Sequence, residues 1–170
     1  GLAVLRLVLK RGGLRFDRFS INGTDLFPLV DRPFGRRDEL FSPRLGLIIK
    51  PREHLSIYGS YSESFLPRSG DQFLSLTTTQ ENLAPEKFTS REIGVKWDVS
   101  DLSLTLAAFQ LDRSNATTPD PANPLLSINV GLTRTRGIEA SVAGRITPNW
   151  QVSGGFALQE GILQGNGTVK

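Results

Sequence analysis

Cysteine is absent from this chain of 170 residues, and histidine occurs only once. Without cysteine the chain forms neither a disulfide framework nor a thiolate metal site. The single histidine, His54, lies in the short segment "PREH", where we expect a solvated turn side chain, and a haem or zinc site would need further ligands. No catalytic constellation of nucleophile, base and acid is evident, so we expect no enzyme.

Long hydrophobic runs are also missing. No stretch approaches the roughly 18 apolar residues of a membrane-spanning helix. The most apolar segment, residues 1–9, is interrupted by Arg6, is followed by Lys10 and Arg11, and lacks a small-residue cleavage site. We therefore expect neither a membrane helix nor a cleaved signal peptide. The missing hydrophobic runs do not argue against a membrane β-barrel, because barrel strands carry a much weaker hydropathy signal than helices.

A run of one charge sign is the third absence. The chain has a net charge of +3 and an isoelectric point near 9.6, but its 20 basic residues are scattered among 17 acidic ones. No basic run or aromatic-basic module is present, so we expect no nucleic-acid partner. Glycine (17) and proline (10) are frequent, at roughly one residue in six, which is typical of a turn-rich all-β protein.

Alternation of apolar and polar residues is what the sequence does contain. In "EIGVKWDV" (92–99), Ile93, Val95, Trp97 and Val99 alternate with mostly charged residues, as in a strand with two unlike faces. No segment holds a helical period. The same period of two predicts about seven strands, at residues 13–19, 44–50, 55–65, 92–99, 102–111, 137–146 and 150–159.

The predicted connections alternate strictly between short and long. Three are tight turns, "PREH", "SD" and "TPN", built on proline, aspartate or asparagine. Three are long, at residues 22–43, 66–89 and 112–135. An up-and-down antiparallel sheet places all tight turns at one end and all long loops at the other. Outer-membrane barrels show this polarity, with short periplasmic turns and long extracellular loops.

The two faces allow two architectures. Charged residues share one face, which is either the wet face of a soluble β-sandwich or barrel that binds carbohydrate or protein through its loops, or the polar lumen of a membrane barrel. Trp97 and Trp150 lie close to tight turns, where an interfacial girdle places aromatic rings. Seven strands are too few for a closed barrel, and an open edge is not tolerated in lipid, so a membrane reading implies part of a larger barrel.

Four segments in order carry a family resemblance: "LSIYGSYSESFLPRSGDQF", "NLAPEKFTSREIGVKWDV", "LSLTLAAFQLDRSNATTPDP" and "TRTRGIEASVAGRITPNWQVSGGFALQEG". Over roughly residues 40–160 the chain resembles the barrel region of TonB-dependent ferric siderophore receptors, particularly the catecholate type. The specific part is the ordered set "PEKF…EIGVKWD", "L…FQLDR.N", "RGIE" and "PNWQVSGG".

The resemblance implies a 22-stranded barrel in the outer membrane of a Gram-negative bacterium, filled by an N-terminal plug and energised by the TonB system. Residues 1–170 would form a partial barrel domain, since we find no plug, TonB box or closing C-terminal strand in them. The expected partners are a ferric siderophore, the TonB system, and outer-membrane lipid including lipopolysaccharide. No cofactor is expected, because the ferric complex would be the transported substrate.

The resemblance also suggests roles for individual residues. Arginines in or beside the long loops suit an anionic ferric siderophore, because guanidinium groups are planar, permanently charged and rich in donors. Alternatively, these arginines pair with Asp38, Asp71 or Asp112, or bind lipopolysaccharide phosphates. The expected ligand-binding residues are Arg36, Arg37, Arg68, Phe73, Arg113, Arg134 and Arg136. The expected lumen-facing residues are Arg44, Glu92, Lys96, Asp98, Glu139 and Arg145, and the expected lipid-facing residues are Ile93, Val95, Trp97, Val99 and Trp150.

Overall fold

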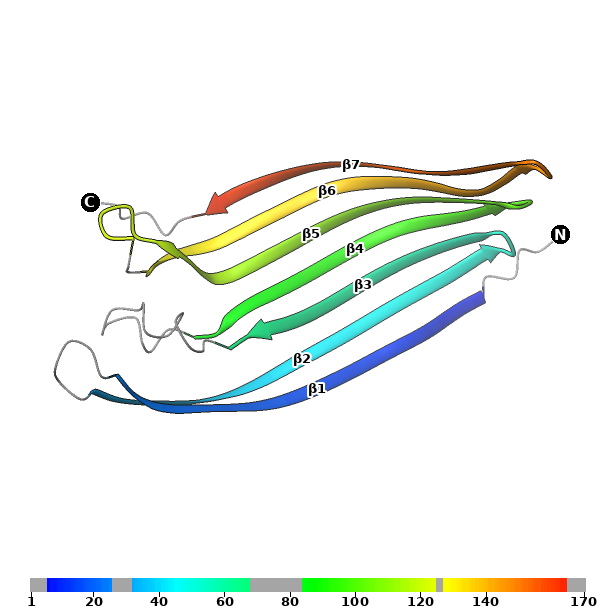
Figure 1. Ribbon diagram of the computed structural model, residues 1–170. Coiled ribbons are helices and arrows are strands. Elements are labelled where there is room, and N and C mark those ends of the chain that lie inside the picture. The colour runs from blue at the N-terminus through cyan, green and yellow to red at the C-terminus, as the bar shows by residue number, and fades with distance from the viewer. Residues whose placement is uncertain (1–5, 26–31, 68–83, 125–126, 165–170) are drawn as a thin grey trace.

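The computed structural model shows a single antiparallel sheet of seven strands (Figure 1). The structure describes residues 6–25, 32–67, 84–124 and 127–164. Within them, no helix is long and apolar enough to cross a membrane. The strands are β1 (Arg6–Asp25), β2 (Arg32–Arg52), β3 (Leu55–Leu66), β4 (Glu86–Val99), β5 (Leu102–Pro119), β6 (Ser127–Thr147) and β7 (Trp150–Gln164).

Each strand pairs with its neighbour in sequence, in the order β1 to β7. Two-residue turns at 53–54, 100–101 and 148–149 join β2 to β3, β4 to β5 and β6 to β7. These turns gather at one end of the sheet, here called the turn end, and the remaining connections lie at the loop end (Figure 1). The predicted all-β, antiparallel, up-and-down architecture with seven strands is therefore confirmed.

The strands are longer than the sequence predicts, and the prediction of three loops of 20 or more residues is wrong for two of them. β1 ends at Asp25 and β2 begins at Arg32, while β5 ends at Pro119 and β6 begins at Ser127. Only the connection between β3 and β4 is long. Most of the added strand length lies at the loop end, where the sequence is mostly polar on both faces, so the apolar alternation that marks a strand is lost. β1 is also longer at the turn end, where residues 6–12 pair with β2.

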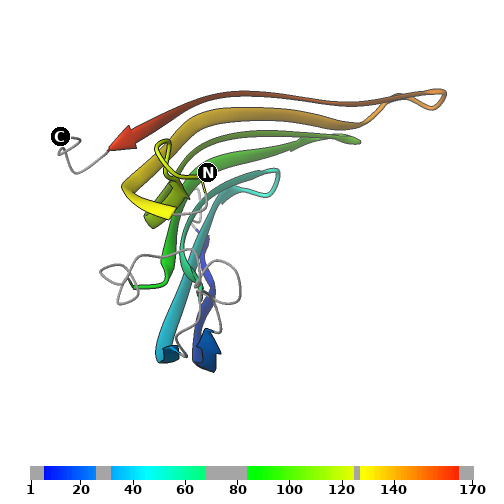
Figure 2. The same cartoon turned by 60° about the vertical axis from the view of Figure 1, so that its left-hand side comes forward.

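The two faces of the sheet differ in what covers them. The register places Ile93, Val95, Trp97 and Val99 on one face, called face A, and Lys96 with its even-numbered neighbours on the other, face B. Ile93 on face A is 62% exposed. The described strands form one curved layer, with no second layer packed against it (Figure 2). The arrangement expected of a soluble sandwich, in which the apolar face is buried against another sheet, is absent from these strands.

Face B is tightly packed near the centre of the sheet. The ring of Tyr58 on β3 covers Gly94 on β4, its direct cross-strand partner, and a Cβ added at Gly94 would lie 2.5 Å from that ring. The next residue in the row, Ala107 on β5, is buried. Two small residues, Gly94 and Ala107, and the aromatic ring of Tyr58 therefore fill this part of face B, with no hydrophobic core beneath them.

Backbone geometry closes the turn end. The amide of Asp98 donates to the carbonyl oxygen of His54, and the amide of Arg145 donates to that of Asp101. Gly144 has a φ of +143°, and any Cβ there would overlap the Asp101 carbonyl oxygen. Glycine at this position therefore allows neighbouring hairpins to approach closely beside a register shift.

Candidate functional site

A continuous apolar belt covers face A toward the turn end. Of the large apolar residues that are exposed on the described strands, only Leu66, Leu111 and Leu163 lie on face B, and Ile146 lies at a register shift. The others define the belt: Leu14, Phe16, Phe41, Leu45, Leu47, Ile57, Ile93, Val95, Trp97, Val99, Leu106, Ile138, Trp150, Phe156 and Leu158. An exposed apolar surface of this extent marks a site that contacts lipid or protein.

The edge of the belt toward the loop end follows one row of paired residues from β7 to β4 and moves toward the loop end across β3 and β2. On β7 the belt ends at Leu158 and is followed by Glu160. The row of paired residues through Leu158 reaches Leu47 on β2, but there the belt continues six residues farther, to Phe41. Because β2 lies five strands from β7, the shift averages about one residue per strand, and all of it occurs between β4 and β2.

The turns are staggered in the same direction. Each successive hairpin turn lies two residues farther along the sheet than the one before it, which again gives about one residue per strand. With a rise of about 3.3 Å per residue and a strand spacing of about 4.8 Å, this corresponds to a tilt of about 35° between strands and the belt normal. Strands of membrane barrels tilt by roughly 35–45°.

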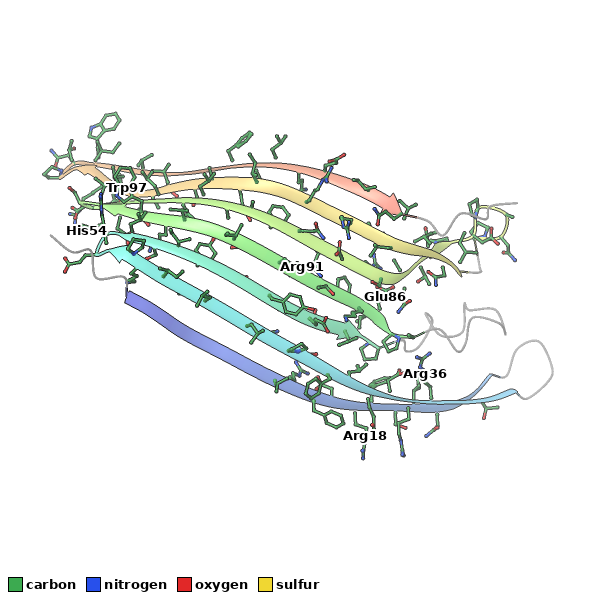
Figure 3. All side chains as sticks on the ribbon, turned by 180° about the vertical axis from the view of Figure 1, so that it is seen from behind. Arg18, Arg36, His54, Glu86, Arg91 and Trp97 are labelled. Carbon is green, nitrogen blue, oxygen red and sulfur yellow. The ribbon has the colours of Figure 1, made fainter. Side chains whose placement is uncertain are left out.

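The height of the belt also fits a bilayer. From Trp150 to Leu158 on β7, nine residues span about 26 Å along the strand, which the tilt reduces to about 21 Å of height. The apolar band of an outer-membrane barrel is about 25 Å tall. Trp97 and Trp150 lie toward the turn end of the belt, as expected for aromatic residues at a membrane interface (Trp97 is labelled in Figure 3).

Beyond the belt, toward the loop end, face A carries charged residues that pair across strands. Asp112 on β5 accepts hydrogen bonds from Arg134 Nε at 2.6 Å and Arg91 Nη1 at 3.0 Å. Gln110 donates to the same carboxylate at 3.0 Å. Asp112 is buried, so its charge has exchanged water for donors of three protein side chains.

These contacts change the ionisation of carboxylates beyond the belt. The hydrogen bond from Arg134, supported by Gln110 and Arg91, holds the pKa of Asp112 below its ordinary value and outweighs the opposing effect of burial. On β3, the hydrogen bonds from Lys87 and Tyr61 lower the pKa of Glu63 in the same way. Both carboxylates therefore stay charged at neutral pH.

Two further ion pairs on face A are open to solvent. Arg136 on β6 pairs with Glu160 on β7 at 3.0 Å, and both side chains are more than half exposed. Arg18 on β1 pairs with Glu39 on β2 at 2.9 Å with nearly the same exposure. Exposed pairs of this kind contribute only about 0–1 kcal/mol to stability. Their position directly beyond the belt is their more informative property.

Face B carries further charged residues, including all six that were expected to face a lumen. Arg44, Glu92, Lys96, Asp98, Glu139 and Arg145 all lie on it. The five residues expected to face lipid, Ile93, Val95, Trp97, Val99 and Trp150, all lie on face A. The register thus separates the two expected sets completely, while what each face contacts stays a prediction.

The arginines expected to bind a ligand do not share a face. Arg36 and Arg113 lie on face B, where they pair with the buried carboxylates of Asp38 at 2.8 Å and Glu86 at 2.7 Å. Arg37, Arg134 and Arg136 lie on face A. All five are strand residues, not loop residues. Arg68 and Phe73 lie outside the described residues.

Figure 3 shows this charged region as the continuation of the belt-bearing strands. Trp97 marks the turn end of β4 beside His54, and Arg91 and Glu86 follow toward the loop end of the same strand. Arg91 is not among the site residues predicted from the sequence. Extending the alternation of residues 92–99 backward by one step would have placed it on face A. The described residues contain no cluster of three or more His, Cys, Asp or Glu side chains that could hold a metal ion.

Comparison with known proteins agrees with this geometry. The family model "TonB dependent receptor-like, beta-barrel" matches residues 11–169. The probable TonB-dependent receptor BfrD of Bordetella pertussis is 37% identical over 161 residues, which is 89% of this chain and 21% of BfrD. The catecholate siderophore receptor Fiu of Escherichia coli K12 is 31% identical over 145 residues, which is 81% of this chain and 19% of Fiu.

A solved structure extends the similarity to the fold. The crystal structure of the siderophore receptor PiuA from Acinetobacter baumannii matches with a TM-score of 0.73 and 29% identity, over 92% of this chain and 23% of PiuA. The chain thus spans about a fifth of the length of the curated relatives it matches. With its family model, its relatives and its belt-bearing sheet in agreement, the chain belongs to the TonB-dependent receptor-like β-barrel family.

Proposed function

We propose that this sheet is part of the wall of an outer-membrane receptor that takes up ferric siderophores with energy from the TonB system. The observation that carries the proposal is the uncovered apolar belt, whose height and slant match a tilted barrel wall in a bilayer. Receptors similar to this chain, PiuA and Fiu, are named as siderophore receptors. A receptor of this family binds and transports, and we propose no enzymatic activity.

In this arrangement face A contacts lipid and face B lines the lumen of a larger barrel, for which we propose 22 strands. The two edge strands, β1 and β7, would then pair with further strands, because unpaired backbone groups are not tolerated in hydrocarbon. The turn end would face the periplasm and the loop end the outside. A plug and TonB-contacting segment would come from the remainder of a longer receptor.

Ligand capture would use the loop end of face B. Among the described residues, Arg36 and Arg113 are the predicted ligand-binding arginines on that face, and each is held in place by a buried carboxylate. An anionic catecholate complex would meet guanidinium groups that are already oriented, which lowers the entropic cost of binding. Arg37, Arg134 and Arg136 would face outward, away from that ligand.

Two acidic residues on face B, Glu92 and Glu139, lie closer to the turn end than these arginines. Glu92 accepts a hydrogen bond from the Tyr58 hydroxyl, and Glu139 lies near both. Neither glutamate forms an ion pair with any described residue. In a lumen filled by a plug, these carboxylates would bind basic side chains of the plug, because a carboxylate removed from water needs a cation or several donors.

Growth under iron limitation tests the transport function. The gene for the complete receptor is deleted, and a panel of ferric siderophores, catecholates among them, is supplied one at a time. We expect loss of uptake of at least one catecholate complex and its recovery when the gene is restored. Unchanged uptake of every complex in the deletion strain would refute the siderophore assignment.

Labelling of single cysteines tests the placement of the two faces. Residues 1–170 contain no native cysteine, and any cysteine elsewhere in the complete receptor is first replaced by serine. We compare Val95→Cys on face A with Lys96→Cys on face B in the complete receptor in intact outer membranes. A lipid-soluble maleimide should label Val95→Cys, and a charged maleimide should label only Lys96→Cys. Labelling of both positions by the charged reagent would contradict a lipid-facing belt.

A further inference from the structure

The ladder between β2 and β3 ends before either strand does. Its last pair toward the loop end joins Arg44 to Ser62. Beyond that pair β3 continues to Leu66, and β2 extends still farther toward the loop end, to Arg32 (Figure 1). There β2 stays paired with β1, and β3 with β4. The sheet therefore splits between β2 and β3 on the loop side of this pair.

A cavity of about 250 Å³ lies at this split, on face B. Pockets that enclose a drug-sized ligand measure roughly 300–1,000 Å³. The cavity therefore has room for one arm of a larger ligand, but not for a whole ferric complex. The residues of face B that line it define what we call the cup: Arg15, Asp17, Phe19, Leu40, Ser42, Arg44 and Ser64.

The cup contains a buried hydroxyl without a partner in the described part of the chain. Ser42 is only 8% exposed, and it lines the cup. No hydrogen bond joins its side chain to any described residue. Burial of a hydroxyl that makes no hydrogen bond is unfavourable, so folding of these strands gives no reason for a serine here. A ligand atom in the cup would supply the missing partner.

Two guanidinium groups border the same cup. Arg44 lies two residues from Ser42 on the same face of β2, and it forms no ion pair with any described residue. Arg15 lies directly opposite Ser42 on β1 and contacts Asp17 through Nε at 2.8 Å. Its Nη groups keep their donors, because a guanidinium has five N–H groups. Two arginines and one aspartate leave the cup with one positive charge in excess.

This set of donors suits a carboxylate. A carboxylate carries a single negative charge, only accepts hydrogen bonds, and matches the planar geometry of a guanidinium group. A phosphate monoester carries about 1.5 to 2 negative charges near pH 7, which one excess positive charge does not balance. A catecholate that binds iron has committed its oxygens to the metal. The cup therefore fits a carboxylate that lies outside the iron-coordinating atoms of a ligand.

We propose that the cup binds a free carboxylate of the ferric siderophore, held by its two guanidinium groups and by a hydrogen bond from the Ser42 hydroxyl. The inference rests on the proposed function and narrows its substrate class to siderophores that carry such a carboxylate. Ser64 of the cup and Arg113 lie in one row of face B, on β3 and β5. Their backbones are therefore about 10 Å apart, so a complex that contacts Arg113 has the cup at its periphery.

The test compares two ferric complexes that differ only in the group beside the catechol. The probes are the complexes of 2,3-dihydroxybenzoylglycine, which has a free carboxylate, and of its neutral amide. The complete receptor, purified in a non-ionic detergent, should bind the carboxylate complex about tenfold more tightly. Arg44→Gln should reduce this preference to within about twofold. Ser42→Ala should also reduce it without lowering stability toward urea, because the hydroxyl has no described partner to lose.

Two variants on face B outside the cup serve as matched controls. Arg145→Gln removes an exposed arginine, and Ser60→Ala removes a hydroxyl from the paired part of β3. Both should keep the preference within about twofold of the wild type. No preference in the wild type, an unchanged preference in Arg44→Gln, or an equal loss in Arg145→Gln would each overturn the proposal. An unchanged preference is the result expected if an acidic side chain of a plug fills the cup.

Uptake under iron limitation separates this inference from the function on which it rests. If deletion of the gene abolishes uptake of a ferric catecholate, but the wild-type receptor does not distinguish the two probes, the cup assignment is overturned and the receptor function stands. If deletion leaves uptake of every complex unchanged, both are overturned. Loss of uptake on deletion together with a preference that depends on Arg44 and Ser42 supports both.

Discussion

The two halves of each strand share one hydrogen-bonded ladder but differ in how their side chains are stabilised. On β4, the turn-end half from Ile93 to Val99 exposes apolar side chains on face A with nothing packed over them. The loop-end half, around Arg91, forms ion pairs and hydrogen bonds with neighbouring strands. Backbone pairing thus continues unchanged while the side chains on face A change from exposed apolar groups to paired charges.

This difference indicates where the stability of each half comes from. Apolar side chains with no protein layer over them gain their free energy from an external apolar phase. The loop-end half instead contains internally satisfied charges such as Asp112, which need no membrane. A charge introduced on face A should therefore be harmful in the turn-end half, whereas the removal of a charge should be harmful in the loop-end half.

The largest expected effect comes from a charge in the belt. Val95→Arg, on face A near the middle of the belt, should lower the free energy of folding into lipid by about 2–4 kcal/mol, the cost of arginine near the bilayer midplane. Leu111→Arg is the matched control, because Leu111 is similarly exposed (38% against 37%) but lies on face B in the loop-end half. Urea unfolding of the complete receptor in lipid vesicles measures both. Equal destabilisation would erase the distinction between the halves.

Packing on face B of the turn-end half gives the next effect. Gly94→Ala places a methyl group against the Tyr58 ring, so the ring must move, and we expect a loss of about 1–3 kcal/mol. Gly154→Ala is the control, since a Cβ there makes only an ordinary contact of 3.9 Å with Val142. The same unfolding measurement applies. If Gly154→Ala lowers the free energy of unfolding as much as Gly94→Ala does, the contact between Gly94 and the Tyr58 ring has no special role in stability.

The loop-end half is tested by neutralising its buried acid. Asp112→Asn leaves Arg91 and Arg134 facing each other without a counter-charge, and we expect a loss of about 1–2 kcal/mol. Glu160→Gln removes an exposed partner and should change stability by less than about 1 kcal/mol. Hydrogen exchange of β5 and β6 amides beyond the belt reports the local effect. A larger change with Glu160→Gln would contradict the burial argument.

The smallest effect is a pH dependence confined to the loop end. The pKa of Asp112 is lower in the folded protein than its ordinary value near 3.8. Its contribution to stability is therefore complete above pH 4 and is lost as the pH falls through the lower folded value. Protection factors of amides beyond the belt, corrected for the intrinsic exchange rate at each pH, should fall below pH 4, while those of belt amides stay constant. Asp112→Asn should abolish its share of this dependence, and an equal fall in that variant would assign it to other groups.

The sequence predicts the turn-end half well and the loop-end half poorly, for a physical reason. One apolar face and one polar face produce the alternation around Trp97, so strand order, turns and faces follow from it. Beyond the belt both faces are polar, so the sequence predicts a loop for residues such as Arg113 and Arg134, although they lie in paired strands. Their division between two faces depends on register, which a count of alternating residues does not extend into polar sequence.

The ring of Tyr58 over Gly94 also acts as a marker of correct alignment when the β3 and β4 strands come together. A shift by one residue would send every side chain to the opposite face. A shift by two would bring Tyr58 opposite Glu92 or Lys96, whose side chains occupy the space that the glycine leaves empty. Only one alignment seats the ring, so an assembling hairpin can discriminate among its registers before any lipid or lumen contact has formed.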